Sequence, residues 1–83
     1  MPRYIAVVKT GYVPDSVAFM IGQDKSDKVR IINIALTAKS SRTSGLILFE
    51  CSQEVVERIE ARKICGIRDI EGPQEFTVVG DLP

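Results

Sequence analysis

The stretch from Gly45 to Ile70 constrains the fold more than any other part of the chain. It begins with an apolar run, Leu46 to Phe49, which is short for a helix and typical of a strand that is covered on both faces. Ser52 then supplies a helix N-cap, because its hydroxyl can accept a hydrogen bond from a backbone amide one turn further on. The pattern predicts a buried strand that leads directly into a helix.

The helix that follows Ser52 has a consistent apolar face and a stop signal. One helical stripe carries the apolar side chains Val55, Val56 and Ile59. Arg62 and Lys63 crowd the last turn, where the helix dipole favours cations. Gly66 is the expected left-handed residue that ends the helix. The next apolar segment, Ile67 to Ile70, predicts a return to the sheet.

Two interpretations remain open for the segment that follows the first strand. Residues Arg3 to Lys9 are rich in β-branched and aromatic side chains and predict that strand. Pro14 at the start and Gly22 at the end of the next segment favour a short helix. The alternative is a second strand from Ser16 to Ile21, because Val17 to Ile21 are all apolar and show no decisive period.

The remaining segments predict further strands and the turns between them. Val29 to Ala38 alternates as a strand should, and Lys39 to Ser44 is a polar hairpin loop. Glu71 to Pro73 forms a turn or a bulge. Glu75 to Val79 is then either a last strand or the continuation of the strand before it.

Together these elements give the order strand, helix, strand, strand, helix, strand in a single domain, residues 1–83. The order resembles the ferredoxin-like split βαβ arrangement, an α+β two-layer sandwich that hosts many unrelated functions. If Ser16 to Ile21 is a strand, the fold is instead a five-stranded antiparallel sheet or partial barrel with one helix. The closing half, CGIRDIEG followed by VVGD, is similar in texture to small regulatory domains of the ACT type. That likeness covers under half of the chain and includes no diagnostic motif.

Composition excludes several classes of protein. The chain has 83 residues, two cysteines and no histidine, which is too few ligands for a cysteine framework or a structural zinc site. Lys+Arg and Asp+Glu are both 11, and this balance argues against a strong polyanion binder. No apolar run approaches the ~20 residues of a membrane span, and the N-terminus has no signal-peptide pattern. We therefore expect a cytoplasmic protein without a metal or cofactor.

Alternation along the predicted strands leaves one face of the sheet turned away from the helices. Ile47, Phe49 and Cys51 share the face that packs on the helices. The opposite face would carry Ala6, Ile31, Asn33, Ala35, Leu46 and Leu48. Such a face is too apolar to stay in water, since monomers rarely expose a large contiguous apolar patch. We expect a non-enzymatic protein-binding or regulatory module that contacts a partner protein or a second copy of itself through Ile31, Ala35, Leu46 and Leu48.

A nucleic-acid-binding protein is the alternative hypothesis. The loop from Lys39 to Gly45 combines cations and hydroxyls that could hold a phosphate backbone, and neighbouring cations could extend the patch. The residues of this predicted anion site are Lys39, Ser41, Arg42, Lys25, Lys28 and Arg30. In the RNA-recognition motif, the strand after such a loop carries aromatic side chains that stack on bases. Here Leu46 and Leu48 stand in those positions and provide no stacking surface.

Catalysis by this chain alone is not expected. Its carboxylates fall in predicted turns and on the outer helix face, and no pair has the apolar surroundings that would shift a pKa. Cys51 and Cys65 match neither a redox motif nor a zinc pattern. Both are therefore predicted to be core residues. A third hypothesis, an auxiliary subunit of a larger enzyme, predicts the same sequence features.

Overall fold

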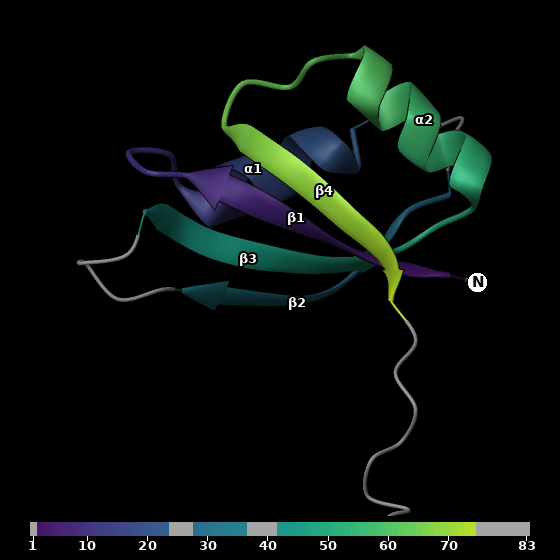
Figure 1. Cartoon of the computed structure of the whole chain (residues 1–83), viewed down its shortest axis with the longest axis horizontal. Coiled ribbons are helices and arrows are strands. Elements are labelled where there is room, and N and C mark those ends of the chain that lie inside the picture. The colour runs from purple at the N-terminus through teal and green to yellow at the C-terminus, as the bar shows by residue number, and fades with distance from the viewer. Residues whose placement is uncertain (1, 24–27, 37–41, 75–83) are drawn as a thin grey trace, which may run out of the picture.

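The computed structural model describes residues 2–23, 28–36 and 42–74. These residues form a small α+β fold of four strands and two helices (Figure 1). In chain order the elements are β1 (Arg3–Lys9), α1 (Pro14–Ile21), β2 (Arg30–Leu36), β3 (Thr43–Glu50), α2 (Gln53–Ala61) and β4 (Ile67–Gln74). The strands form one antiparallel sheet in the order β2-β3-β1-β4, so β2 and β4 are the edge strands of the described sheet.

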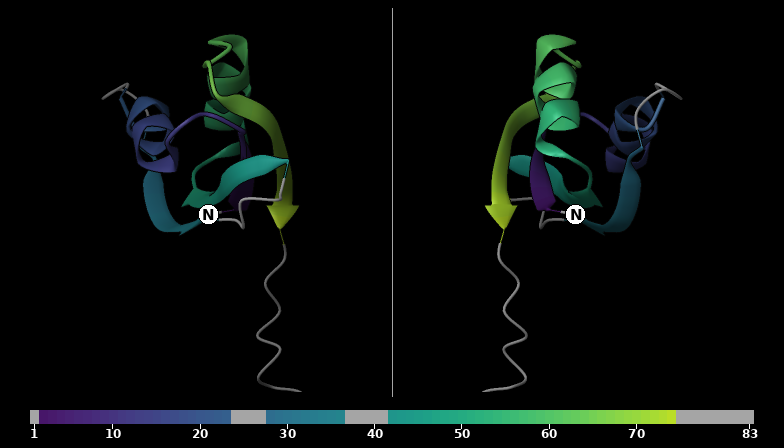
Figure 2. Two further views of the ribbon diagram at one scale, coloured as in Figure 1. Left: turned by 90° about the vertical axis from the view of Figure 1, so that its left-hand side faces the viewer. Right: turned by 90° about the vertical axis from the view of Figure 1, so that its right-hand side faces the viewer.

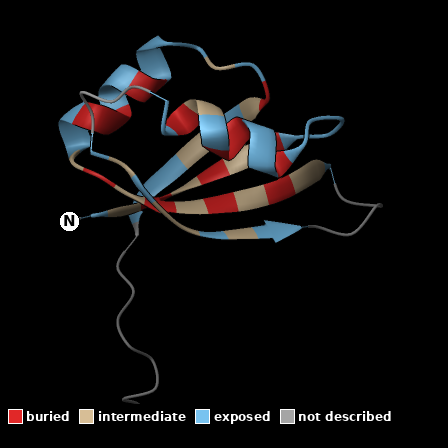
Figure 3. Ribbon diagram, turned by 180° about the vertical axis from the view of Figure 1, so that it is seen from behind, coloured by how far each residue is buried: buried red, intermediate tan, exposed pale blue. Residues whose placement is uncertain are grey.

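Both helices lie on the same side of the sheet, which makes the molecule a two-layer sandwich (Figure 2). The core lies between the layers, and alternate residues of β1 and β3 supply its sheet side (Figure 3). The buried apolar residues are Tyr4, Ala6, Val8, Val17, Ala18, Ile21, Ile47, Phe49, Cys51, Val55, Val56 and Ile59. The α+β class with two layers is therefore confirmed.

Residues 14–21 form a helix, so the alternative of five strands and one helix is wrong for the described residues. Pro14 occupies the first turn, where its missing amide costs no hydrogen bond, and Gly22 is the C-cap. The buried face of α1 consists of Pro14, Val17, Ala18 and Ile21. Phe19 is 70% exposed, although its neighbours in sequence are equally apolar. Capping residues thus identify this helix where the hydrophobic period does not.

α2 begins and packs as the sequence predicts. The Val55 amide donates to the Ser52 hydroxyl over 3.3 Å, which satisfies one of the amides left unpaired at a helix start. The residues buried in the core are Val55, Val56 and Ile59. At the other end, the Arg62 guanidinium donates to the Met20 carbonyl and ties α2 to the last turn of α1.

α2 ends earlier than the sequence predicts. Its C-cap is Arg62, and Lys63 rather than Gly66 is the first left-handed residue, with a φ of 48°. In a continued helix, Ile64 would lie about 130° from the buried stripe, because each residue turns by about 100°. The left-handed Lys63 redirects the chain, and Ile64 packs against the core. Gly66, with a φ of 96°, belongs to a second turn in which the Ile67 amide donates to the Ile64 carbonyl over 3.3 Å.

β4 is a single strand with two register shifts against β1, one between Arg3 and Ile5 and one between Val7 and Val8. Arg3 pairs with Gln74 and Ile5 with Glu71, so three steps along β4 match two steps along β1. This shift lies at residues 71–73, where the sequence predicts a turn or a bulge, and the strand continues through it as a bulge allows. The predicted strand from Glu75 to Val79 lies outside the described residues.

β2 contains a similar shift, which moves Ile31 to the helix side of the sheet. Ile31 pairs with Phe49 and Asn33 with Leu48, so Ile32 has no directly opposed partner on β3. Strict alternation places Ile31 on the same face as Asn33, and this prediction is wrong. The extra residue inverts the alternation, and Ile31 packs against the core.

Gly45 of β3 lies beneath the first turn of α1. A Cβ atom at this position would stand 2.6 Å from the Ala35 carbonyl oxygen and 2.7 Å from Pro14 Cγ. Both distances are far below van der Waals contact, so only a glycine lets α1 approach the sheet this closely.

We predict that Gly45→Ala lowers the free energy of unfolding by about 1–3 kcal/mol, measured by urea denaturation. The nearest obstacle is a backbone oxygen, which cannot move aside as the end of a flexible side chain can. Gly22→Ala is the matched control, because the only neighbour of its new Cβ within 4 Å is the Ala18 carbonyl oxygen at 3.8 Å. Equal stability of the two variants would contradict the close approach of the Ala35 carbonyl of β2 and of Pro14 to Gly45.

Candidate functional site

The face of the sheet that points away from both helices is apolar at its centre, and we call it the open face (Figure 2). Ile5 pairs with Leu48 and Val7 pairs with Leu46 across β1 and β3. These four side chains alternate with the buried core positions of the same strands, and they are only partly buried. No described helix covers them, so the centre of the open face is aliphatic and accessible.

Beside this centre the open face contains a hollow of about 160 Å³. Its lining residues are Ile5, Asn33, Ala35, Leu46 and Leu48. The side-chain oxygen of Asn33 already accepts a hydrogen bond from the Ile34 amide at 2.9 Å. The remaining lining is aliphatic and small at Ala35, so the hollow suits an apolar side chain better than a polar ligand.

Cations predominate at one end of the open face. The Glu50 carboxylate accepts a hydrogen bond from Arg3 Nε at 3.3 Å and lies 3.9 Å from Arg30 Nη1. The Arg30 side chain is 75% exposed, whereas the Glu50 side chain is 18% exposed. Two guanidinium groups around one carboxylate leave this end net positive, and Arg30 on β2 is the more exposed cation.

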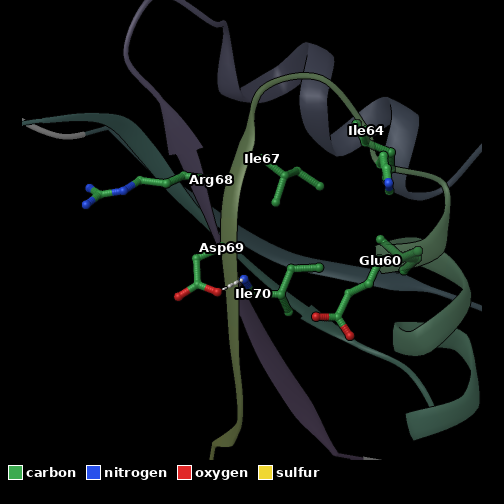
Figure 4. Close-up of a pocket in the computed structure, with 8 residues that line it drawn as sticks. Glu60, Ile64, Ile67, Arg68, Asp69 and Ile70 are labelled. Carbon is green, nitrogen blue, oxygen red and sulfur yellow. Dashed lines mark hydrogen bonds between the residues drawn. The ribbon is translucent and has the colours of Figure 1, made fainter.

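Carboxylates lie along the β4 side of the same face. Asp69 and Glu71 are the direct partners of Val7 and Ile5 on β1, and paired residues in an antiparallel sheet share a face. Both carboxylates are exposed. Arg68 lies next to them, and in Figure 4 Arg68 and Asp69 point away from α2. The open face is therefore positive toward the start of β2 and mainly negative along β4.

Each edge strand has one amide that is already occupied by a neighbouring side chain. The Ile34 amide of β2 donates to Asn33 Oδ1 over 2.9 Å, and the Ile70 amide of β4 donates to Asp69 Oδ1 over 2.9 Å. Addition of a further strand at either edge requires unpaired backbone groups there. These two side chains therefore disfavour edge pairing and leave the open face as the better docking surface.

Three of the four residues predicted to make the partner contact lie on the open face, namely Ala35, Leu46 and Leu48. Ile31 faces the helices instead. Ala6 was also predicted on this face, but it is buried in the core with 0% exposure. Ile5 and Val7 occupy the positions expected of Ala6. Alternation counted from Tyr4, the large aromatic residue of β1, would have identified them, because Tyr4 and Ala6 point the same way.

The predicted anion site is not assembled by its described members. Lys39, Ser41 and Lys25 lie outside the described residues. Arg42 is exposed at the start of β3, where its carbonyl accepts a hydrogen bond from the Thr10 hydroxyl at 2.6 Å. Lys28 and Arg30 lie at the opposite end of the β2–β3 pair, since Arg30 pairs with Glu50 at the end of β3. Arg42 and these two cations therefore do not form one patch.

A second depression lies between α2 and β4 (Figure 4). Its volume is about 200 Å³, and its lining residues are Ile59, Glu60, Lys63, Ile64, Ile67, Arg68, Asp69 and Ile70. Ile64, Ile67 and Ile70 also pack against the buried core. The depression is therefore an incompletely filled margin of the core, with charged residues at its rim.

The two cysteines have different surroundings. Cys51 is fully buried, as predicted, and Cys65 is exposed, so the prediction that both are core residues is wrong for Cys65. α2 ends at Ala61 with Arg62 as its C-cap, so Cys65 lies in the turn between α2 and β4, where it is exposed. The structure contains both residues as thiols.

Two features of other functional classes are absent from the described residues. Among them, no group of three or more cysteines and carboxylates is placed to hold a metal ion. Within the same ranges, no helix is long and apolar enough to cross a membrane. No family model, curated protein or solved structure matches the chain. The functional inference therefore depends on the open face itself.

Tyr4 makes the stability of the core depend on pH in the alkaline range. Its ring lies 5.9 Å from that of Phe49, measured between centroids. Burial raises the pKa of the Tyr4 phenol above its ordinary value of 10.0, and electrostatic interactions with Cys51 and Glu57 add to the rise. The unfolded chain therefore ionises this phenol first as the pH rises. Its contribution to stability is fully present below pH 10.0 and is lost above it.

We predict that the free energy of unfolding falls as the pH rises above 10.0, and that Tyr4→Phe reduces this fall. The measurement is urea denaturation at a series of alkaline pH values. Tyr12→Phe is the matched control, because Tyr12 is 43% exposed whereas Tyr4 is 3% exposed. The same alkaline slope in the wild type and in Tyr4→Phe would show that Tyr4 is not the group responsible.

We also predict that a thiol reagent modifies Cys65 in the native protein while Cys51 remains protected, because access limits the reaction of a buried thiol. Mass spectrometry of the labelled protein then shows one added group. The control is Cys65→Ser, which should be labelled only after denaturant is added. Rapid labelling of native Cys65→Ser would mean that Cys51 is accessible.

Proposed function

We propose that this chain is a non-enzymatic protein-binding module that docks through the open face. The observation that carries the proposal is the aliphatic centre of that face, on the side of the sheet opposite both described helices, formed by Ile5, Val7, Leu46 and Leu48. Burial of apolar surface lowers the free energy of a complex by about 25 cal/mol for each Å² that is removed from water. A partner that covers these side chains gains this term without disturbing the core.

The shape of the surface also supports a protein partner. The hollow beside the centre is small and mostly aliphatic, which suits an inserted apolar side chain. Charged residues surround the apolar centre on two sides, and a polar rim around an apolar centre is the usual anatomy of a protein interface. The two occupied edge amides, of Ile34 and Ile70, further favour contact with the face over addition of a strand.

The assignment to the ferredoxin-like arrangement belongs to the same proposal. Its support is the order of elements along the chain together with the strand order β2-β3-β1-β4. Fold alone implies no activity, because this arrangement hosts many unrelated functions. What it contributes here is geometry, since an arrangement with both helices on one side leaves the other side of the sheet for binding.

We predict that Leu46→Glu abolishes docking and lowers the free energy of unfolding by about 1–2 kcal/mol, because Leu46 is partly buried in the separate chain. The carboxylate would be fully buried in the contact, whereas it can still reach water in the separate chain. The measurement uses a photoreactive amino acid at position 48 in living cells. We expect a cross-linked product of defined mass, formed by a second copy or by another protein, which disappears when Leu46→Glu is added.

Phe19→Glu is the matched control for this experiment. Phe19 is 70% exposed on α1, so the change introduces the same charge on the helix side of the molecule. The cross-linked product should persist in this variant. Absence of any product from position 48, or a product that survives Leu46→Glu, would overturn the proposed function.

A further inference from the structure

We propose that the occupant of the open face is a second copy of this chain, stacked face to face about a two-fold axis that runs parallel to the strands. This inference rests on the proposed function and names its partner. A two-fold axis in this direction places strand order β2-β3-β1-β4 of one copy over β4-β1-β3-β2 of the other. The two central strands therefore exchange partners across the interface, β3 over β1 and β1 over β3.

The apolar centre is self-complementary in this arrangement. Ile5 and Leu48 are directly paired within one copy, and so are Val7 and Leu46. Rotation about the axis keeps the position along the strands, so Leu48 lies over Ile5 of the second copy and Leu46 lies over its Val7. Two layers of aliphatic side chains result, each with two residues from each copy. Aligned packing of two sheets about 10 Å apart has this layered form.

The charges are complementary in the same arrangement. Glu50 ends β3 and Arg3 begins β1 at the same level of the sheet, since the two residues pair within one copy. The axis therefore places Glu50 over Arg3 of the second copy. At the edges, β2 of one copy lies over β4 of the other. Arg30 stands at the level of Arg3, and Glu71 pairs with Ile5, two residues further along β1. The exposed Arg30 therefore approaches Glu71 of the second copy. The two-fold symmetry repeats each contact, so the positive end of each copy lies against the negative margin of the other.

The other face-to-face dimer, with its axis across the strands, lacks this complementarity. It places each strand over the same strand of the second copy in reverse. β4 then lies over β4, and Asp69 and Glu71 of one copy meet the same two carboxylates of the other. Like charges at an interface suppress an arrangement of this kind. The charge pattern therefore selects the axis parallel to the strands.

The size of the face predicts a weak and reversible dimer. Strands of seven or eight residues in a four-stranded sheet give a face of roughly 25 by 19 Å, from spacings of about 3.3 Å along a strand and about 4.8 Å between strands. Two such faces bury on the order of 900 Å², below the roughly 1,200 Å² at which standard stable interfaces begin. Dimer formation should therefore depend on concentration.

The test is a charge exchange between the two edges, measured by sedimentation velocity over a range of concentrations. Arg30→Glu and Glu71→Arg should each weaken dimerisation by about tenfold or more, because each places two like-charge contacts in the symmetric dimer. A mixture of the two variants should recover it, since both contacts in the mixed dimer join opposite charges. Native mass spectrometry identifies the mixed species by its mass.

Glu60→Arg is the matched control, with the same charge change on α2 at the helix side of the molecule, and it should dimerise as the wild type does. Thermal melts verify that each variant folds. A wild type that stays monomeric at its highest soluble concentration overturns the second copy as partner. If the wild type dimerises but the mixture of Arg30→Glu and Glu71→Arg does not recover dimerisation, the two-fold axis parallel to the strands is wrong. In either case, a product from position 48 with a different protein would leave the proposed function standing.

Discussion

The register between β1 and β3 is the constraint on which the rest of this structure depends. It places Tyr4 opposite Phe49 and Ala6 opposite Ile47, so the inward side chains of the two central strands meet under the helices. Because side chains alternate across a strand, a slip by one residue would exchange the core and the open face. The glycine at position 45 acts within this register, since it lets Pro14 at the start of α1 approach the sheet closely.

Sequence reasoning succeeded where local chemistry alone determines structure. The Ser52 cap and the apolar stripe of α2 depend on neighbours within one or two helical turns. It failed where pairing between distant strands intervenes. The extra residue in β2 moves Ile31 to the helix side, and only the partner strand reveals it. The left-handed Lys63 follows an earlier end of α2 than predicted and lets Ile64 pack against the core, a change that the helical pattern alone does not indicate.

A chain of 83 residues has little apolar surface to spare. Small domains bury a smaller fraction of their surface than large ones, so their stability is marginal. The aliphatic side chains at positions 5, 7, 46 and 48 are only partly buried in the single chain, so part of their apolar surface does not yet contribute to its stability. In a complex the same side chains add stability through mass action, because the partner binds only the folded state. Docking through the open face would therefore stabilise this domain as well as serve its function.

The edges and the face of the sheet have opposite roles in this interpretation. A sheet edge with unpaired amides would accept a strand from any chain, with little dependence on side chains. The side chains of Asn33 and Asp69 each accept a hydrogen bond from an amide of an edge strand, that of Ile34 and that of Ile70. These bonds disfavour unspecific pairing with a strand of another chain. As the proposed docking surface, the open face would discriminate through shape and charge, since its apolar centre and its separated charges match a surface with the reverse pattern. In one orientation the chain itself presents that reverse pattern, because its positive end and its negative margin lie on opposite edges of the same sheet.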